Sequence, residues 1–227
     1  MENASKRRLA RAIIGGRAEF VLRAVYAARY AARFDAPGRR TKDRFELYDL
    51  ISSEVIRGTS FDYLEFGVFQ GESIRHISSC NKHPDARFWG FDSFEGLPSD
   101  WNQKNPKGTF DVGGQPPSID DRRVRFVKGW FDQSLPMFLR DYRPQEKLWI
   151  HVDGDLYSSA MQVLTLLNPY IRSGTVLIFD EIEDLLHEFK ALCDYEAMSA
   201  KRLDLFAATE DCRQAAFVSS LGTIGAK

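Results

Sequence analysis

The most informative segment of the sequence reads Tyr63-Leu64-Glu65-Phe66-Gly67-Val68-Phe69-Gln70-Gly71-Glu72-Ser73. It begins as a short apolar run typical of a buried strand, and it then places two glycines in a G-x-x-x-G spacing before a helical segment. Glycines at such a turn let a ligand approach the backbone, and the free amides of the following helix can hold a carboxylate or a phosphate. The spacing differs from the G-x-G-x-x-G of dinucleotide-binding proteins. The stretch therefore predicts a strand, a ligand-binding turn and a helix.

Strand-like and helix-like segments alternate on both sides of this turn. Short apolar runs predict buried strands at 61–66, 87–91, 124–127, 148–152 and 175–179. Helical patterns fit at 72–80, 130–140, 157–167 and 183–199. Two last runs, 203–208 and 215–219, are joined by too few residues for a parallel crossover, so they predict an antiparallel hairpin. We expect an α/β fold with a doubly wound, mostly parallel seven-stranded sheet that ends in this hairpin.

The N-terminal segment has a different composition. Residues 5–34 are rich in Ala and Arg and predict a basic amphipathic helix, and Thr41 can cap a second helix after a break at 35–38. Its apolar residues recur at helical spacing, namely Ile14, Ala18, Val21, Val25, Ala28 and Ala32. We expect residues 1–40 to form a helical extension of a main domain at 41–227. The favoured interpretation is a helix that packs on the body or on a second subunit, and peripheral membrane contact is a less favoured alternative.

Composition excludes several classes of protein. The 227 residues include 44% hydrophobic and 28% charged residues, so the chain is neither disordered nor collagenous. The net charge of −1 argues against a nucleic-acid partner, although residues 1–44 carry an excess of basic groups. Three cysteines without a C-x-x-C spacing suggest neither a disulfide framework nor a zinc cluster, and we expect a cytoplasmic protein. The start has no apolar stretch typical of a secretory signal, so we expect the mature chain to be the whole chain.

Acidic residues follow three of the predicted strands. Asp92 lies 21 residues after Gly71, where a carboxylate that binds ribose hydroxyls is expected, and the two signals together favour an adenosine-containing ligand. Asp153, Asp180 and Glu181 can converge if their strands are neighbours, and converging carboxylates suit Mg²⁺, Mn²⁺ or Ca²⁺. The alternative is that Asp180 and Glu181 cap the following helix. His151, on a buried strand, is expected to be a hydrogen-bonded core residue.

One connection is too long for a plain turn. Residues 94–121 contain four glycines, four prolines and the aromatic residues Trp101 and Phe110. Connections of this length in compact domains are usually functional lids or disordered linkers. Because of its aromatic residues we expect a lid, with Trp101 able to stack on a sugar or an aromatic ring.

Five motifs in order resemble the macrocin O-methyltransferase-like family of class I S-adenosylmethionine-dependent enzymes. They lie at 63–73, 90–98 (GFDSFEGLP), 127–136 (VKGWFDQSLP), 151–159 (HVDGDLYSS) and 178–181 (IFDE). The resemblance covers about residues 41–219 and implies a Rossmann-like methyltransferase fold. Members of this family methylate hydroxyl groups, notably on sugars of natural products.

The resemblance implies roles for individual residues. The loop around the methionine part of S-adenosylmethionine would contain Glu65, Gly67, Gly71 and Ser73. The ribose and the adenine would be contacted by Asp92, Ser93, Gly129 and Trp130, and Asp153 would also contact the cofactor. The positions at which metal-dependent relatives hold Mg²⁺ correspond to Asp153, Asp180 and Glu181.

The proton acceptor is the least defined part of the expected site. Leu156 stands where related catechol-type enzymes place a lysine, so that lysine cannot be the base. Asp155 is preferred as the base because it lies two residues from Asp153, although a contact to the cofactor amine or a helix cap would also suit it.

We therefore expect an S-adenosylmethionine-dependent O-methyltransferase, assisted by Mg²⁺ or another divalent cation. Its acceptor would be a hydroxyl of a sugar or of another natural-product or polysaccharide unit, and the protein is expected to be a homo-oligomer. The nearest alternative is a metal-independent methyltransferase acting on a phenol or a carboxylate. Two more distant ones are a protein that works through its basic N-terminus and a nucleotide-sugar oxidoreductase. The chain has no Tyr-x-x-x-Lys sequence, which counts against the oxidoreductase.

Overall fold

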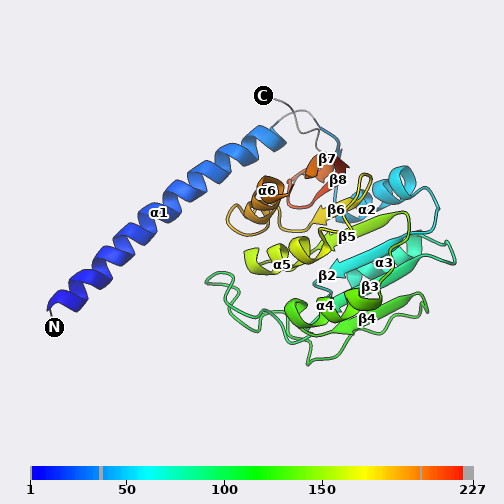
Figure 1. Cartoon of the computed structure of the whole chain (residues 1–227), viewed down its shortest axis with the longest axis horizontal. Coiled ribbons are helices and arrows are strands. Elements are labelled where there is room, and N and C mark those ends of the chain that lie inside the picture. Colours follow the sequence, from blue (N-terminus) through cyan, green and yellow to red (C-terminus); the bar gives the residue numbers. More distant parts are fainter. Residues whose placement is uncertain (1, 36–37, 200, 222–227) are drawn as a thin grey trace.

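The computed structural model describes the backbone of residues 2–35, 38–199 and 201–221, and the side chains of residues 18–35, 38–199 and 201–220. A central sheet has helices on both faces, and one long helix projects from the body (Figure 1). The helices are α1 (Glu2–Phe34), α2 (Arg44–Ile51), the π-helical turn η1 (Ser52–Ile56), α3 (Glu72–Cys80), α4 (Phe131–Asp141), α5 (Tyr157–Leu167) and α6 (Glu188–Met198). The strands are β1 (Arg40–Thr41), β2 (Asp62–Phe66), β3 (Arg87–Asp92), β4 (Val124–Lys128), β5 (Leu148–Val152), β6 (Val176–Phe179), β7 (Lys201–Thr209) and β8 (Ala215–Leu221).

The strand order of the sheet is β1-β7-β8-β6-β5-β2-β3-β4. β4, β3, β2, β5 and β6 pair in parallel, whereas β8 is antiparallel to both β6 and β7. From β2 the chain builds outward through β3 to β4 and then returns to β5 on the other side of β2. The switch point therefore lies between β2 and β5, which is where open α/β sheets bind ligands. The expected doubly wound sheet with a C-terminal hairpin is confirmed.

The sheet has one strand more than the seven expected. β1 consists of Arg40 and Thr41, which pair in parallel with β7 at the edge of the sheet. Two residues are too few to give a sequence pattern. The expectation that Thr41 caps a helix is wrong, because the cap of α2 is Asp43, whose carboxylate accepts hydrogen bonds from the amides of Phe45 and Glu46. The domain boundary expected after residue 40 falls inside β1.

Apolar side chains cover both faces of the sheet and fix the central strands. On β5, Ile150 and Val152 pack with α4, α5 and α6, whereas Trp149 packs with α2 and α3 on the other face. All five residues of β5 are buried, as they are in β2. Burial on both faces is the normal state of parallel strands. It leaves the strand ends as the places where polar side chains reach a ligand.

Among the residues of helix α1 whose side chains are described, those that pack on the body lie near its C-terminal end. Tyr26 and Phe34 are buried, and both rings pack against Phe189 of α6. Further from the body, Phe20 and Val21 are 75% and 58% exposed. The basic side chains of Lys6, Arg7, Arg8, Arg11 and Arg17 lie outside the described side chains. No helix in the described part of the chain is long and apolar enough to cross a membrane.

Candidate active site

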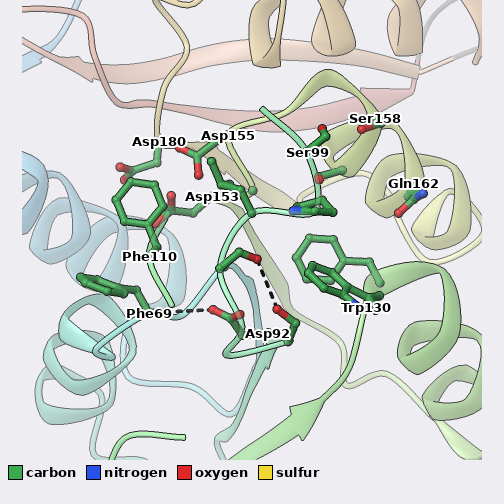
Figure 2. A pocket seen from close by; sticks show the side chains of 18 of the residues that line it. Phe69, Asp92, Ser99, Phe110, Trp130, Asp153, Asp155, Ser158, Gln162 and Asp180 are labelled. Atoms are coloured by element: carbon green, nitrogen blue, oxygen red, sulfur yellow. Dashed lines mark hydrogen bonds between the residues drawn. The ribbon is translucent and has the colours of Figure 1, made fainter. Parts of the chain in front are cut away.

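A cavity of about 600 Å³ opens at the carboxyl ends of β2, β3, β5 and β6. The strand ends contribute polar residues, α4 and α5 form one wall, and the 94–121 segment covers part of the opening. Figure 2 shows Asp153, Asp155 and Asp180 on one side, Trp130 and Gln162 on the other, and Asp92 below them. Of the expected site residues, those that line the cavity are Gly67, Asp92, Ser93, Trp130, Asp153, Asp155, Asp180 and Glu181.

Gly67 follows β2 directly, lines the cavity and lies against the carbonyl group of Asp153, which follows β5. Its φ is +100°, and a Cβ atom built on it would lie 1.6 Å from the carbonyl oxygen of Asp153. The backbone amide of Asp153 donates to the carbonyl of Phe66, and the amide of Gly67 donates to the carbonyl of Phe91. These bonds hold three strand ends together. The side chain of residue 67 must therefore be absent for Asp153 to occupy its place.

Asp92 fastens the glycine turn to the end of β3. One of its carboxylate oxygens accepts hydrogen bonds from the amides of Val68 and Phe69, and the other accepts from the amide of Phe94. A carboxylate has about four acceptor positions, so one remains for a hydroxyl group in the cavity. Asp92 thus combines the position expected of a ribose-binding residue with a structural role that its sequence position does not reveal.

The other expected cofactor residues lie behind the cavity wall. Among the described residues, Glu65, Gly71, Ser73 and Gly129 are not part of the cavity lining. Glu65 is fully buried and accepts a hydrogen bond from Tyr63, and burial raises its pKa to about 8. The hydroxyl of Ser73 lies 3.3 Å from that of Tyr48 on α2. Their direct contact with a cofactor stays a prediction.

Two of the three expected metal ligands converge. Oxygens of Asp153 and Asp180 lie within 4.8 Å of each other and of a ring nitrogen of His151. Burial, followed by the charge of Asp180, raises the pKa of Asp153 well above its usual range. Although burial opposes its ionisation, Asp180 has a lowered pKa because His151 lies beside it.

His151 joins this group from the buried strand. Its Nδ1 is 2.7 Å from the hydroxyl of Tyr63, as expected for a hydrogen-bonded core histidine. Its Nε2 is 3.5 Å from Oδ1 of Asp180, a contact that does not meet hydrogen-bond geometry. Both of these buried atoms are therefore left without a hydrogen-bond partner among the described residues. Unpaired buried polar atoms are costly, and this set of one nitrogen and two carboxylates fits a divalent cation.

Glu181 is not part of this convergent group. Its carboxylate lies 3.3 Å from Nε of Arg213, and burial, followed by the charge of Glu183, raises its pKa to about 8. It still lines the cavity, so its role as a metal ligand stays a prediction. Neither Asp180 nor Glu181 caps the next helix, because α6 begins only at Glu188.

Asp155 stands at the mouth of the same acidic cluster. It has a φ of +58°, which is uncommon for a residue other than glycine. Burial, followed by the charge of Asp180, raises its pKa to about 7. A carboxyl group whose pKa lies near neutrality can exchange a proton there, which is what a general base requires.

Arg44 is a cavity residue that the sequence patterns missed. It lies at the start of α2 and forms an ion pair with Glu72 at the start of α3. Its pKa is raised although burial opposes its charge, and Asp180 and Asp153 are among the neighbours that favour the charged form. A single arginine near a helix start carries no pattern, so only the three-dimensional structure places it beside the acidic cluster.

The 94–121 segment folds over the cavity as an ordered loop. Leu97 and Thr109 are joined by a backbone hydrogen bond, and a β-bridge pairs Glu95 with Asp111. Phe110 lines the cavity and packs edge-on against Phe69.

Trp101 has a different place from the one expected. Its indole N–H donates to the carboxylate of Asp184, which lies between β6 and α6. Among the described residues it is not part of the cavity lining. The tryptophan therefore holds the 94–121 segment to a second loop instead of offering a stacking surface.

Comparisons with known proteins found related sequences. A family model described as a methyltransferase domain matches residues 64–182. The chain is 26% identical over 172 residues to mycinamicin III 3''-O-methyltransferase from Micromonospora griseorubida, covering 63% of this chain and 66% of that protein. It is 28% identical over 160 residues to demethyldecarbamoylnovobiocin O-methyltransferase from Streptomyces niveus, covering 59% of each. The chain thus spans less than two thirds of the length of these curated relatives.

Solved structures give the same fold. The O-methyltransferase NovP superposes with a TM-score of 0.59 and 24% identity, covering 77% of this chain and 78% of that one. The calicheamicin methyltransferase CalS11 superposes with a TM-score of 0.61 and 22% identity, covering 78% and 80%. The Rossmann-like methyltransferase fold expected from the five motifs is confirmed.

Proposed function

Because the chain belongs to this methyltransferase-domain family, we propose that it transfers the methyl group of S-adenosylmethionine to a hydroxyl of a glycosylated natural product or a polysaccharide unit. One observation carries the proposal. A single cavity joins the glycine turn and Asp92 on one side to the Asp153–Asp180 cluster on the other. The named activities of the two curated relatives support a hydroxyl acceptor.

The cofactor half of the proposal rests on the glycine turn. When bound, S-adenosylmethionine supplies a methyl group on a positively charged sulfur. Gly67 lines the cavity beside Asp92, Asp92 accepts hydrogen bonds from ribose hydroxyls, and Trp130 offers an aromatic face to the adenine. Carboxylates nearby favour the positive charge of the sulfonium.

The acceptor half rests on the acidic cluster. A sugar hydroxyl is a poor nucleophile at neutral pH, and a Mg²⁺ ion held by Asp153 and Asp180 would lower its pKa and orient it. Asp155 takes the hydroxyl proton while the oxygen bonds to the methyl carbon and the carbon–sulfur bond breaks. The 94–121 segment excludes water from the reacting atoms.

The decisive experiment incubates the full chain with labelled S-adenosylmethionine, Mg²⁺ and a panel of glycosylated acceptors, phenols and carboxylates. Mass spectrometry should detect the gain of one methylene on a glycosylated hydroxyl. Transfer only to phenols or carboxylates, at the same rate in EDTA and in Mg²⁺, would favour the metal-independent alternative.

Replacing Asp92 by Ala tests the cofactor half. The change removes the ribose acceptor and leaves the amides of Val68, Phe69 and Phe94 without their carboxylate partner. Hydrogen bonds to a charged group contribute about 1.5–3 kcal/mol each, so S-adenosylmethionine should bind at least about tenfold more weakly by calorimetry. Asp120→Ala, which removes an exposed carboxylate from the 94–121 segment, is the control and should keep the affinity of the unaltered chain.

An exposed face of α1 supports assembly with a second copy of the chain. The exposed residues Ala18, Val21, Val25, Ala28 and Ala32 are spaced alternately by three and four, the spacing of a coiled-coil seam. Tyr26 and Phe34, which pack on the body, lie on another side of the helix. A seam of this kind fits the same seam of another helix, and we infer a homo-oligomer held by α1.

Val25→Asp is expected to break this assembly, because it places a charge in the seam. Light scattering after gel filtration should give the mass of one chain for Val25→Asp and a multiple of it for the unaltered protein. Ala27→Asp, at an exposed position on a different side of the helix from the seam, should keep the larger mass. A single-chain mass for the unaltered protein, or its binding to anionic vesicles through α1 as a monomer, would contradict the proposal.

A further inference from the structure

Three side chains from two helices converge on the surface behind the sheet, away from the cavity. Nε2 of His76 lies 2.8 Å from Oδ1 of Asp49, and Sγ of Cys80 lies 3.2 Å from the same oxygen and 3.5 Å from the same nitrogen. Asp49 belongs to α2, whereas His76 and Cys80 are one turn apart on α3. The three atoms therefore form a small triangle that no part of the methyl transfer uses.

The triangle differs from a catalytic relay. In a Cys–His–Asp relay the thiol and the carboxylate contact opposite nitrogens of the imidazole, which passes a proton between them. Here both groups lie against the same nitrogen, Nε2 of His76, and also against each other. One ring nitrogen cannot serve both neighbours as a relay. Instead, the oxygen, the nitrogen and the sulfur of the triangle surround one common point.

The size of the triangle matches the coordination shell of a tetrahedral metal ion. Zinc binds sulfur at about 2.3 Å and nitrogen or oxygen at about 2.0–2.2 Å, which places neighbouring ligands about 3.3–3.7 Å apart. The separations in the structure run from 2.8 to 3.5 Å. The ends of the two exposed side chains, Asp49 and Cys80, need to move outward by only a few tenths of an ångström to admit the ion.

The surroundings of the three side chains suit metal binding. His76 and Cys80 share one helix face because they are four residues apart, and the His76 ring lies 4.8 Å from the ring of Phe45. The side chain of Asp49 is 56% exposed and Cys80 is exposed, so solvent can supply a fourth ligand. Thiolate and imidazole ligands select zinc-class ions over Mg²⁺, which prefers oxygen ligands throughout.

We propose that Asp49, His76 and Cys80 form a binding site for Zn²⁺ or a similar transition-metal ion, separate from the acidic cluster of the cavity. The ion would join α2 to the C-terminal end of α3. These helices carry Arg44 at the cavity and the Tyr48–Ser73 contact behind the glycine turn. Binding would therefore stiffen the wall behind the cofactor loop. The inference does not depend on which acceptor the enzyme methylates.

Cobalt provides a direct test, because a Co²⁺–thiolate bond gives a near-ultraviolet charge-transfer band that oxygen and nitrogen ligands do not give. The metal-stripped full chain should develop this band with one Co²⁺ per chain, and Zn²⁺ but not Mg²⁺ should remove it. Cys80→Ser should abolish the band, and His76→Ala should weaken Co²⁺ binding at least about tenfold.

Two control variants separate this site from the others. Cys212→Ser removes a different thiol and should keep the band, and Asp180→Asn alters the acidic cluster and should keep it too. A band of unchanged strength in Cys80→Ser, or no band in the unaltered protein at saturating Co²⁺, would overturn the proposal. Circular dichroism on each variant shows that the fold is retained.

Discussion

Asp180→Asn should lower kcat by about 1,000-fold while S-adenosylmethionine affinity changes by less than about threefold. Asp180 lies among buried carboxylates, and its Oδ1 has no hydrogen-bond partner among the described residues, so we expect this atom to hold a cation against the acceptor hydroxyl. Asn keeps the size of the side chain and removes its charge. The change therefore tests cation binding without opening a cavity.

The same substitution should lower the thermal unfolding midpoint at neutral pH. Although burial opposes its ionisation, Asp180 has a lowered pKa because His151 lies beside it, so the folded chain favours the charged carboxylate. Asn removes that charge together with its contribution to stability, which is present at neutral pH and is lost in acid. Steady-state rates, calorimetry and thermal scans on one preparation give all three readouts.

The outcome that contradicts the metal proposal is specific. If Asp180→Asn retains activity within about threefold of the unaltered chain and EDTA has no effect, the cluster does not act through a cation. Asp132→Asn serves as the control, because it removes a carboxylate from the cavity wall on α4, and it should leave the EDTA sensitivity of the unaltered chain intact.

Gly67→Ala should abolish folding or reduce it to a trace of soluble protein. A methyl group at this position would lie 1.6 Å from the carbonyl oxygen of Asp153 and 2.6 Å from its carbonyl carbon. Both atoms belong to the backbone at the end of β5, so relief requires β2 and β5 to separate at the centre of the sheet. We expect a loss of more than about 4 kcal/mol in the free energy of unfolding, beyond the usual range for a single substitution.

Gly58→Ala is the matched control. Gly58 also has a positive φ, of +67°, but a Cβ atom there would meet nothing within 4 Å. The control isolates the cost of backbone conformation, about 1–2 kcal/mol, from the cost of the steric clash. Chemical denaturation of both variants measures the difference. Equal losses at the two positions would show that the contact between Gly67 and Asp153 is not a constraint.

The sequence predicted the central sheet because each buried strand is a continuous apolar run between turn residues. The start of α6 was placed too early, at residue 183, because the polar residues after β6 are compatible with a helix, whereas the structure begins α6 at Glu188. β1 was missed since its pairing with β7 depends on contacts far apart in the sequence.

The sequence also predicted only part of the candidate site. Side chains two residues apart on a strand share a face, so His151 lies on the same side as Asp153, whereas the chain turns after β6 and carries Glu181 toward Arg213. Strand order predicts which strand ends are neighbours, but it does not fix the direction of the first side chain beyond a strand. Arg44 comes from outside the alternating strands and has no sequence signal.

The hydrogen bond between Trp101 and Asp184 limits how the choice of acceptor can be changed. It ties the 94–121 segment to the loop that follows Asp180 and Glu181, so the cover of the cavity and the loop beside its acidic residues are joined. Because the two segments are joined, a change in one is expected to require a matching change in the other. Grafting the 94–121 segment of a relative onto this chain should give a working hybrid only when the partner loop at 180–187 is transferred with it.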